Sequence, residues 1–307
     1  MADAKVTMLD IARQNNSDRV VGLIEEASLA IPEVGLFPAR TIKGTQYKTL
    51  VRSALPDVGY RKANEGVAVT KSTLENRLVE CFILDGSWHM DKAVADAAED
   101  GPMAACAVEA SGHVQGAFQS LAKQIYYGPA SGVSGAADGP PGLINALDAT
   151  NMEVDVTGTG TLGSSVWAVK FGPQGVQIVF GKDGKFSEGE IIEQMVTLSS
   201  KHMWAYAQEL LGWQGLAVHS TKAIGRIRDL TTGTGKTLTD AMMGALLAKF
   251  SVGWKPDVFL MSRRSLEQLR SSRTATNATG APAPTPTEYE GIPIVPTDAI
   301  TNTETCV

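Results

Sequence analysis

The sequence contains few of the residues on which catalysis, metal binding and disulfide bonding usually depend. Its 307 residues include four histidines and three cysteines, all at widely separated positions. The three thiols, Cys81, Cys106 and Cys306, match neither a disulfide framework nor the closely paired ligands of a zinc site. The patterns H-E-x-x-H and G-x-S-x-G do not occur. The sequence therefore predicts free thiols and no catalytic residue, metal ligand or cofactor.

Long apolar runs and an excess of positive charge are also missing. No apolar run approaches the roughly 20 residues that span a bilayer, and the first residues lack the apolar core of a signal peptide. We therefore expect no membrane segment and a protein that stays in the cytosol where it is made. The 27 lysines and arginines are outnumbered by 33 aspartates and glutamates, which argues against broad binding to nucleic acid. A local basic strip at 262–273 is interpreted as a solvated helix face.

The stretch "TTGTGKTLTD" at 231–240 contains the Gly-Lys-Thr that ends a phosphate-binding loop. Such a loop also needs a glycine five residues before Gly235, because its backbone N–H groups must wrap the phosphates, and Leu230 stands there. Thr237 and Asp240 instead form a variant capping pair in front of an amphipathic helix that starts at Leu238. We interpret the glycines as turn residues.

Gly158, Gly160 and Gly163 have the spacing of a dinucleotide-binding fingerprint. That site needs a strand before the glycines and a helix after them, because the helix N-terminus holds the pyrophosphate. A strand-like run at 152–157 precedes them, but 164–172 alternates with the period of a strand. The pattern predicts a glycine-rich turn between two strands.

The residues that are present describe a globular chain, with 43% hydrophobic and 20% charged residues. Its length predicts about two domains or one elaborate one. Residues 17–30 predict a short helix with Ser17 as its N-cap, followed by an extended arm. Two strand-like runs at 46–54 and 73–84 then flank a polar, glycine-bearing segment. A long hairpin of this kind has little core of its own, so we expect it to need a partner surface.

Small and apolar residues recur at intervals of three and four from Met103 to Ile125, which predicts one long helix of about 35 Å. The segment at 91–100 is also helix-like, so a break between the two is expected. Further along the chain we expect the following elements: strands at 152–157, 164–172 and 175–181, a helix at 202–213, a long strand at 215–230, a strand at 256–262, a helix at 263–270, a mobile loop at 271–290 and a terminal strand at 291–300.

This order of elements resembles the major capsid proteins of tailed bacteriophages with the Hong Kong 97-type fold. The residues that carry the resemblance are "PDVFLMSRRSLEQLR" at 256–270 and "YEGIPIVPTDAI" at 289–300, which look like the helix, loop and strand of that family's axial domain. The segments at 38–66 and 72–97 look like the arm and extended loop of a podophage-type subfamily. One departure is that the chain ends soon after the terminal strand, so its peripheral strands must come earlier, and 215–230 is the best candidate.

The resemblance implies an α+β fold with an N-terminal arm, an extended β-hairpin loop, a spine helix, and peripheral and axial domains. The implied boundaries are as follows: arm 1–43, extended loop 44–90, peripheral domain with spine helix 91–128, axial domain 129–180, peripheral strands and helix 181–237, and a second axial part 238–307.

The resemblance further implies a non-enzymatic protein of the virion capsid that assembles in the host cytoplasm. Its copies would form pentamers and hexamers of an icosahedral shell around double-stranded DNA, without sequence-specific contacts. The implied partners are a separate scaffolding protein, a portal and a decoration protein, and no membrane. The candidate intersubunit contacts are the charged residues of the hairpin: Arg52, Arg61, Lys62, Glu65, Glu75 and Arg77. Two alternatives stay open, a cytosolic nucleotide-binding enzyme built on the GTGKT segment and an encapsulin-type protein compartment.

Overall fold

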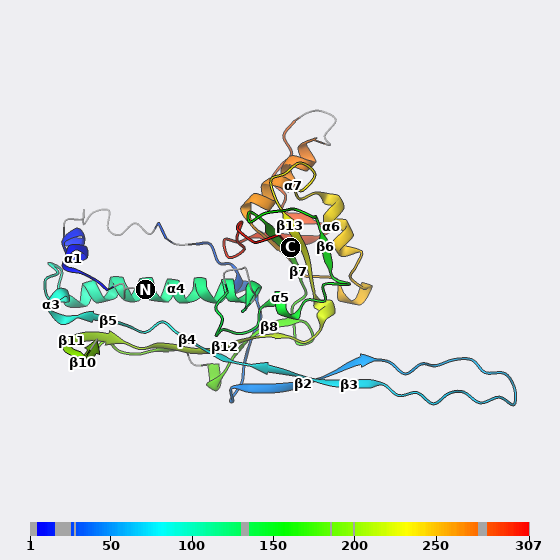
Figure 1. Cartoon of the computed structure of the whole chain (residues 1–307), viewed down its shortest axis with the longest axis horizontal. Coiled ribbons are helices and arrows are strands. Elements are labelled where there is room, and N and C mark those ends of the chain that lie inside the picture. Colours follow the sequence, from blue (N-terminus) through cyan, green and yellow to red (C-terminus); the bar gives the residue numbers. More distant parts are fainter. Residues whose placement is uncertain are drawn as a thin grey trace.

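The computed structural model is elongated, with a compact body at one end of a long helix and a hairpin that projects from that body (Figure 1). It describes residues 5–15, 26–27, 29–129, 135–184, 186–198, 200–275 and 281–306. The helix predicted at 17–30 falls mostly outside these described residues.

The spine of the molecule is α4 (Pro102–Tyr127), which confirms the predicted long helix. Pro102 occupies its first turn, where a missing N–H costs nothing. The helix stops at Gly128, whose φ of 54° suits a residue without a side chain. Before it lies α3 (Lys92–Ala95), which is capped by the Asp91 carboxylate at 2.9 Å from the amide nitrogen of Ala93. The predicted break between the two helices is therefore present.

Two sheets run beneath the spine (Figure 1). The five-stranded sheet has the order β1-β8-β12-β4, with β9 also paired to β12. Its strands are β1 (Ala39–Thr41), β4 (Phe82–Asp85), β8 (Val176–Phe180), β9 (Phe186–Glu188) and β12 (Leu210–Val218). The three-stranded sheet, at the far end of the spine, consists of β5 (Trp88–Asp91), β10 (Ile192–Leu198) and β11 (Lys201–Gln208).

The compact body is built on a six-stranded sheet with the order β15-β16-β14-β7-β13-β6. Its strands are β6 (Glu153–Asp155), β7 (Ser164–Val169), β13 (Ile224–Leu230), β14 (Val258–Met261), β15 (Glu288–Tyr289) and β16 (Ile292–Pro296). The helices α6 (Asp240–Leu247) and α7 (Arg263–Ala275) lie against this sheet (Figure 1). The remaining short helices are α1 (Met8–Asn15), α2 (Glu33–Leu36), α5 (Leu143–Ala146), and the 3₁₀ turns η1 (Lys182–Gly184), η2 (Thr221–Ala223) and η3 (Val252–Trp254).

The spine helix takes part in two separate cores. Near its C-terminus, Leu121, Ile125 and Tyr126 pack against Trp167 of the six-stranded sheet. Near its N-terminus, Cys106 packs with residues of α1, β5 and β11. The buried strand β7 forms much of the body's interior, since all of its residues are buried. The two ends of the molecule are thus stabilised by different apolar clusters.

Two sequence predictions in this region are wrong. The segment 202–213 is not a helix but the end of β11 and the start of β12. Its alanines, glutamine and leucines favour helix, but β11 pairs on both edges, with β10 and β5, and tertiary pairing overrides local propensity. The long strand expected at 215–230 is divided by η2 into β12 and β13, which belong to different sheets.

Candidate assembly surfaces

The projecting hairpin consists of β2 (Gln46–Ala54) and β3 (Thr73–Glu80). The strands pair antiparallel from Gln46 opposite Glu80 to Ala54 opposite Thr73, with one irregularity before the last pair. The first strand lies where the sequence predicted it, whereas the run predicted at 73–84 is divided at Cys81 into β3 and β4, which belong to different sheets. The hairpin meets the body only at its root, and the rest extends away from the molecule (Figure 1).

The root of the hairpin is anchored by one face. Val79 is buried against Val179 and Ala217 of the five-stranded sheet. On the same face, the Tyr47 hydroxyl lies 2.9 Å from Nε2 of His219, and the Arg77 guanidinium donates to the His219 carbonyl at 3.1 Å. These contacts fix the direction in which the hairpin leaves the body.

The opposite face of the hairpin exposes apolar side chains. Leu50, Leu74 and Leu78 are 63%, 51% and 48% exposed, and the cross-strand register places them together with Lys48 and Arg52. Five more large apolar residues are exposed beyond the strands: Leu55, Val58, Tyr60, Val67 and Val69. An apolar surface of this kind marks an interaction site, because leaving it in water is unfavourable.

All six charged candidates lie on the hairpin, and none forms an ion pair inside the described part of the chain. Arg61 donates to the Glu65 carbonyl at 2.9 Å, which closes a turn near the tip. Glu75 and Arg77 lie on the anchored face, whereas Arg52 lies on the apolar face. Lys62 is exposed near the tip. The structure thus leaves these charges available to a neighbour, but their pairing there stays a prediction.

The N-terminal arm is attached to the body by a buried carboxyl group. Glu33 at the start of α2 is fully buried and accepts hydrogen bonds from the hydroxyls of Tyr126 and Thr297 through Oε1. Its Oε2 accepts no hydrogen bond from the residues that the structure describes. The Ala30 amide also donates to the Asp298 carboxylate at 2.9 Å. Burial raises the pKa of Glu33 above the usual range of a carboxyl group, so the protonated form suits this site better than the ion.

Because the pKa of Glu33 is raised in the folded state, its stabilising contribution is complete below the unfolded pKa and is lost as pH rises through the folded pKa. We therefore expect the stability advantage of wild type over Glu33→Gln to shrink as pH increases from acidic to neutral. Thermal unfolding of the two proteins across this pH range tests the expectation. A difference that does not change with pH would contradict it, and Glu26→Gln, at an exposed position, serves as the control.

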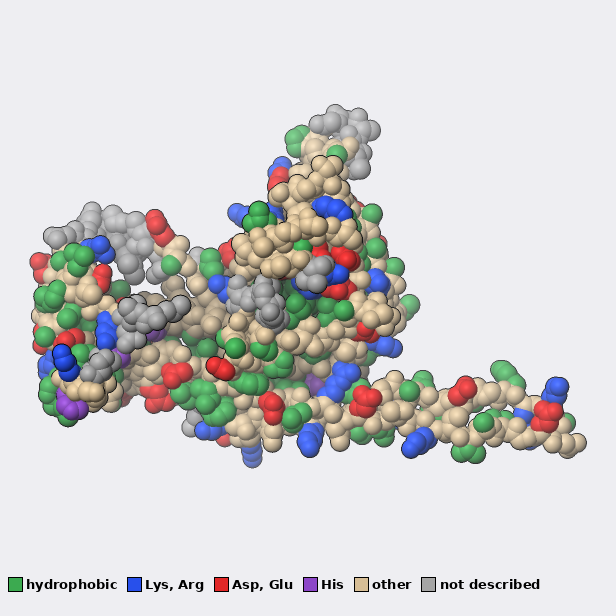
Figure 2. Space-filling view, in the orientation of Figure 1, with side chains coloured by type: hydrophobic (Ala, Val, Ile, Leu, Met, Phe, Trp, Pro, Cys, Tyr) green, Lys and Arg blue, Asp and Glu red, His purple; other side chains and the backbone are tan. Residues whose placement is uncertain are grey.

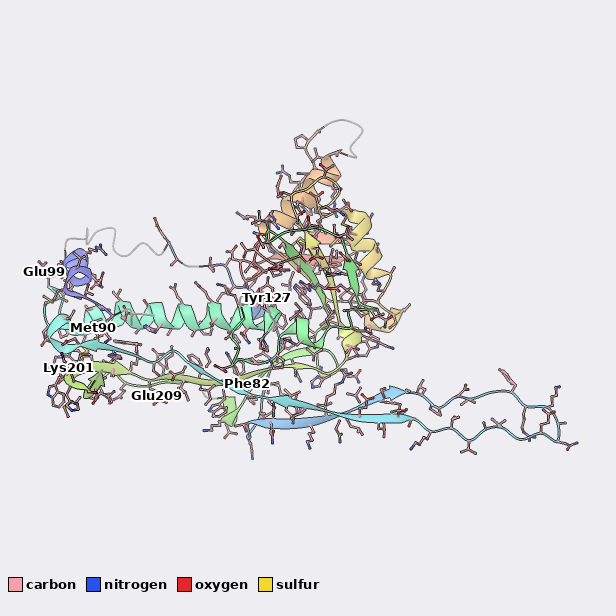
Figure 3. The ribbon with its side chains drawn as sticks, in the orientation of Figure 1. Phe82, Met90, Glu99, Tyr127, Lys201 and Glu209 are labelled. Atoms are coloured by element: carbon pink, nitrogen blue, oxygen red, sulfur yellow. The ribbon has the colours of Figure 1, made fainter. Side chains whose placement is uncertain are left out.

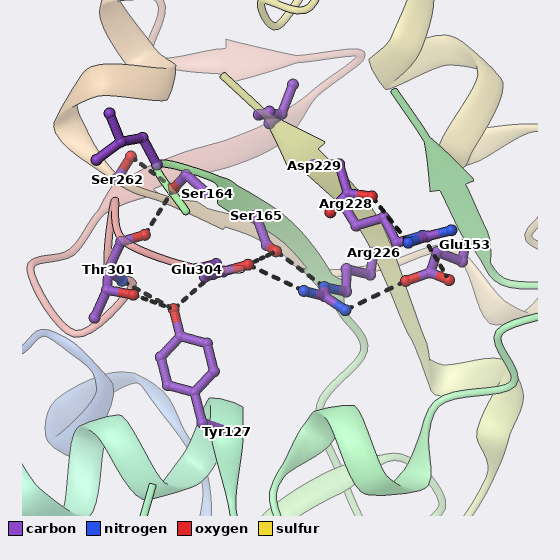
Figure 4. A network of polar contacts seen from close by, with 12 residues as sticks. Tyr127, Glu153, Ser164, Ser165, Arg226, Arg228, Asp229, Ser262, Thr301 and Glu304 are labelled. Carbon is purple, nitrogen blue, oxygen red and sulfur yellow. Dashed lines mark hydrogen bonds and ion pairs between the residues drawn. The ribbon is translucent and has the colours of Figure 1, made fainter. Parts of the chain in front are cut away.

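Sequence reasoning missed a network of polar side chains inside the body (Figure 4). Glu304 is 3% exposed and accepts from the Tyr127 hydroxyl at 2.6 Å, the Ser165 hydroxyl at 2.5 Å and the Arg226 guanidinium at 3.0 Å. Arg226 also pairs with Glu153 at 3.3 Å. Burial and the nearby Glu304 carboxylate raise the pKa of Tyr127, so its hydroxyl stays protonated and donates. The network joins the end of the spine helix, the sheet and the C-terminal segment.

Neither glycine motif forms a phosphate site. Gly158, Gly160 and Gly163 lie between β6 and β7, which confirms the predicted turn between strands. The Gly235-Lys236 segment joins β13 to α6, and Lys236 Nζ donates to the Val156 carbonyl at 3.0 Å and to Thr157. The predicted capping pair was wrong. Thr239 is the N-cap of α6 and accepts from the Met242 amide, because the helix begins at Asp240, later than the apolar pattern suggested.

Two further expectations were that the chain has no metal site and no membrane segment. Within the described ranges, no group of three or more histidine, cysteine, aspartate or glutamate side chains could hold a metal ion. Among the same residues, no helix combines the length and hydrophobicity needed to span a bilayer.

The spine helix joins two packed ends, and the extended hairpin and the anchored arm present surfaces suited to neighbouring copies. This arrangement is that of a capsid shell protein of the Hong Kong 97-type fold. The chain belongs to the family described as "Major capsid protein GP7", whose model matches residues 16–307. This membership favours neither the nucleotide-binding enzyme nor the encapsulin-type compartment. No curated protein sequence matches the chain.

A solved bacteriophage structure has the same fold. The near-atomic structure of bacteriophage Epsilon15 matches with a TM-score of 0.75 and 21% identity, and the match covers 100% of this chain and 98% of that one. The capsid of Myoviridae phage XM1 matches with a TM-score of 0.46 and 11% identity over 70% of this chain and 97% of that one. The SrpI encapsulin of Synechococcus elongatus matches with a TM-score of 0.48 and 8% identity over 74% and 96%.

Proposed function

We propose that copies of this chain assemble as pentamers and hexamers into a closed icosahedral shell that encloses double-stranded DNA. The observation that supports this most directly is the hairpin, which exposes a continuous set of apolar and charged side chains beyond its root. Each contact of this kind is weak, since exposed ion pairs contribute about 0 to 1 kcal/mol. Repetition over many symmetry-related copies makes the sum large.

The proposed shell has no enzymatic activity of its own. Its proposed partners are a separate scaffolding protein, a portal and a decoration protein, and it forms the capsid of a virion assembled in the host cytoplasm. The net charge of −6 agrees with packaged DNA that is enclosed without sequence-specific contacts. The division into arm 1–43, extended loop 44–90, and peripheral and axial domains between 91 and 307 is part of the same proposal.

Negative-stain electron microscopy and sedimentation velocity of the purified chain test the proposal, with the chain produced alone and together with its neighbouring genes. We expect closed particles or rings of capsomer size in at least one of these conditions. Nuclease treatment followed by extraction of protected nucleic acid identifies the cargo. A homogeneous monomer or dimer under every condition would contradict the shell, and protein cargo in place of DNA would contradict the proposed content.

A further inference from the structure

A basic groove lies where the hairpin leaves the body. One wall is the edge of β2 from Thr49 onward, and the other is formed by the loops that carry Gln174, His219 to Lys222, and Trp254. The groove has a volume of about 670 Å³. Arg52, Arg77 and Lys222 line it, and no aspartate or glutamate does. Such a groove attracts a negatively charged segment, because three cations line it from different sides and no carboxylate does.

In the same groove, one ring nitrogen of a buried histidine has no hydrogen-bond partner among the described residues. His219 is 5% exposed, and its Nδ1 makes no hydrogen bond although its Nε2 lies 2.9 Å from the Tyr47 hydroxyl. When that hydroxyl donates to Nε2, the ring proton is on Nδ1, which leaves an unsatisfied buried donor. An unpaired buried donor is unfavourable, so the described structure leaves one polar group at this end of the groove unsatisfied.

The chain carries a matching acidic surface elsewhere. Glu188, Glu190 and Glu209 are exposed and form no ion pair among the residues that the structure describes. They lie close together because β9 pairs antiparallel with the start of β12. Next to this pairing, the Gly189 amide donates to the Glu209 carbonyl at 2.8 Å. Figure 2 shows acidic side chains below the spine helix in the region where Figure 3 labels Glu209. None of these three glutamates is among the described residues that line the basic groove.

We infer that the basic groove of one copy binds the acidic surface of a second copy. This inference rests on the proposed shell function. Two different patches that complement each other across copies form a heterologous contact, which is the kind that generates rings. Nucleic acid fits less well, because the groove's apolar lining, including Leu50 and Trp254, interrupts the cations that a phosphate backbone would follow. The three glutamates of the acidic surface equal in number the three cations that line the groove.

Charge reversal and its compensation test this contact. We expect Arg52→Glu with Lys222→Glu to raise the protein concentration needed for particle formation by about tenfold or more, and Glu188→Lys with Glu209→Lys to do the same. A chain that carries all four substitutions regains complementarity, so we expect assembly within about threefold of wild type. Lys201→Glu with Lys249→Glu is the control, because it makes the same charge change at exposed positions outside the groove.

The outcomes distinguish a failure of this contact from a failure of the shell. If the groove variant assembles at the wild-type concentration, or the four-substitution chain is no better than either pair, this inference is wrong while the shell stands. Normal particles that retain less DNA would overturn it in favour of a nucleic-acid site. A wild-type chain that forms no particle under any condition overturns the proposed function and this inference together.

Discussion

We expect a chain in which residues 56–71 are replaced by Asn-Gly to fold normally but to form no particles. Every residue from Arg52 to Lys71 is exposed, and none belongs to an apolar core, so the deletion removes no buried contact. Asn-Gly suits a two-residue hairpin turn between Leu55 and Ser72, the residues that follow the last pair of β2 and β3, Ala54 with Thr73. The exposed Val58, Tyr60 and Val69 are lost, and with them the surface that a neighbour would cover.

Circular dichroism and thermal unfolding check that the shortened chain is folded, and electron microscopy checks assembly. Val58→Ser with Tyr60→Ser and Val69→Ser is the matched variant, because it keeps the length of the hairpin and removes only its apolar side chains. We expect this variant to be defective as well. If the shortened chain forms closed particles as readily as wild type, the hairpin is not an assembly surface.

The second large effect is expected at Glu304. Replacing it with alanine leaves Arg226 buried with a reduced set of partners and removes the acceptor of Tyr127 and Ser165. Removal of one partner from a buried ion pair typically costs about 3 to 5 kcal/mol. We therefore expect Glu304→Ala to lower the free energy of unfolding by that amount, which denaturant unfolding of the unassembled chain measures.

Two matched substitutions serve as controls for Glu304→Ala. Glu304→Gln keeps an acceptor oxygen, so its loss of stability should be smaller than that of Glu304→Ala. Glu267→Ala removes an exposed partner of Arg270 at 3.6 Å and should change stability by less than about 1 kcal/mol. Equal losses for all three variants would show that the buried network has no special role.

The spine helix and the hairpin could be predicted from the sequence, because each displays one clear periodicity over many residues. The spacing from Met103 to Ile125 indicated the helix, and the runs at 46–54 and 73–84 indicated strands, of which the second is divided at Cys81 into β3 and β4. The segment 202–213 could not be assigned correctly, since one edge of β11 pairs with β5, more than 100 residues earlier in the chain. Local propensity carries no information about such partners.

The buried charges were missed for a related reason. Glu33, Arg226 and Glu304 are ordinary polar letters in the sequence, and only the fold removes them from water. One signal could have been used. Arg226 lies between Ile224 and Ile227 in a strand with little exposed surface, and a charge in such a strand needs a partner. The charged hairpin residues were easier to place, because a hairpin without a core must be exposed on most of its surface.

The spine helix has a mechanical consequence for the shell. Its ends belong to separate apolar cores, but no residue from Ala107 to Gly116 is buried. Gly112 and Gly116 lie in this stretch without buried residues, where each lowers helix stability by about 1 kcal/mol relative to alanine. The middle of the helix is therefore held by less packing than either of its ends. In the proposed shell, bending of this stretch would let one sequence adopt the slightly different curvatures of five-fold and six-fold positions.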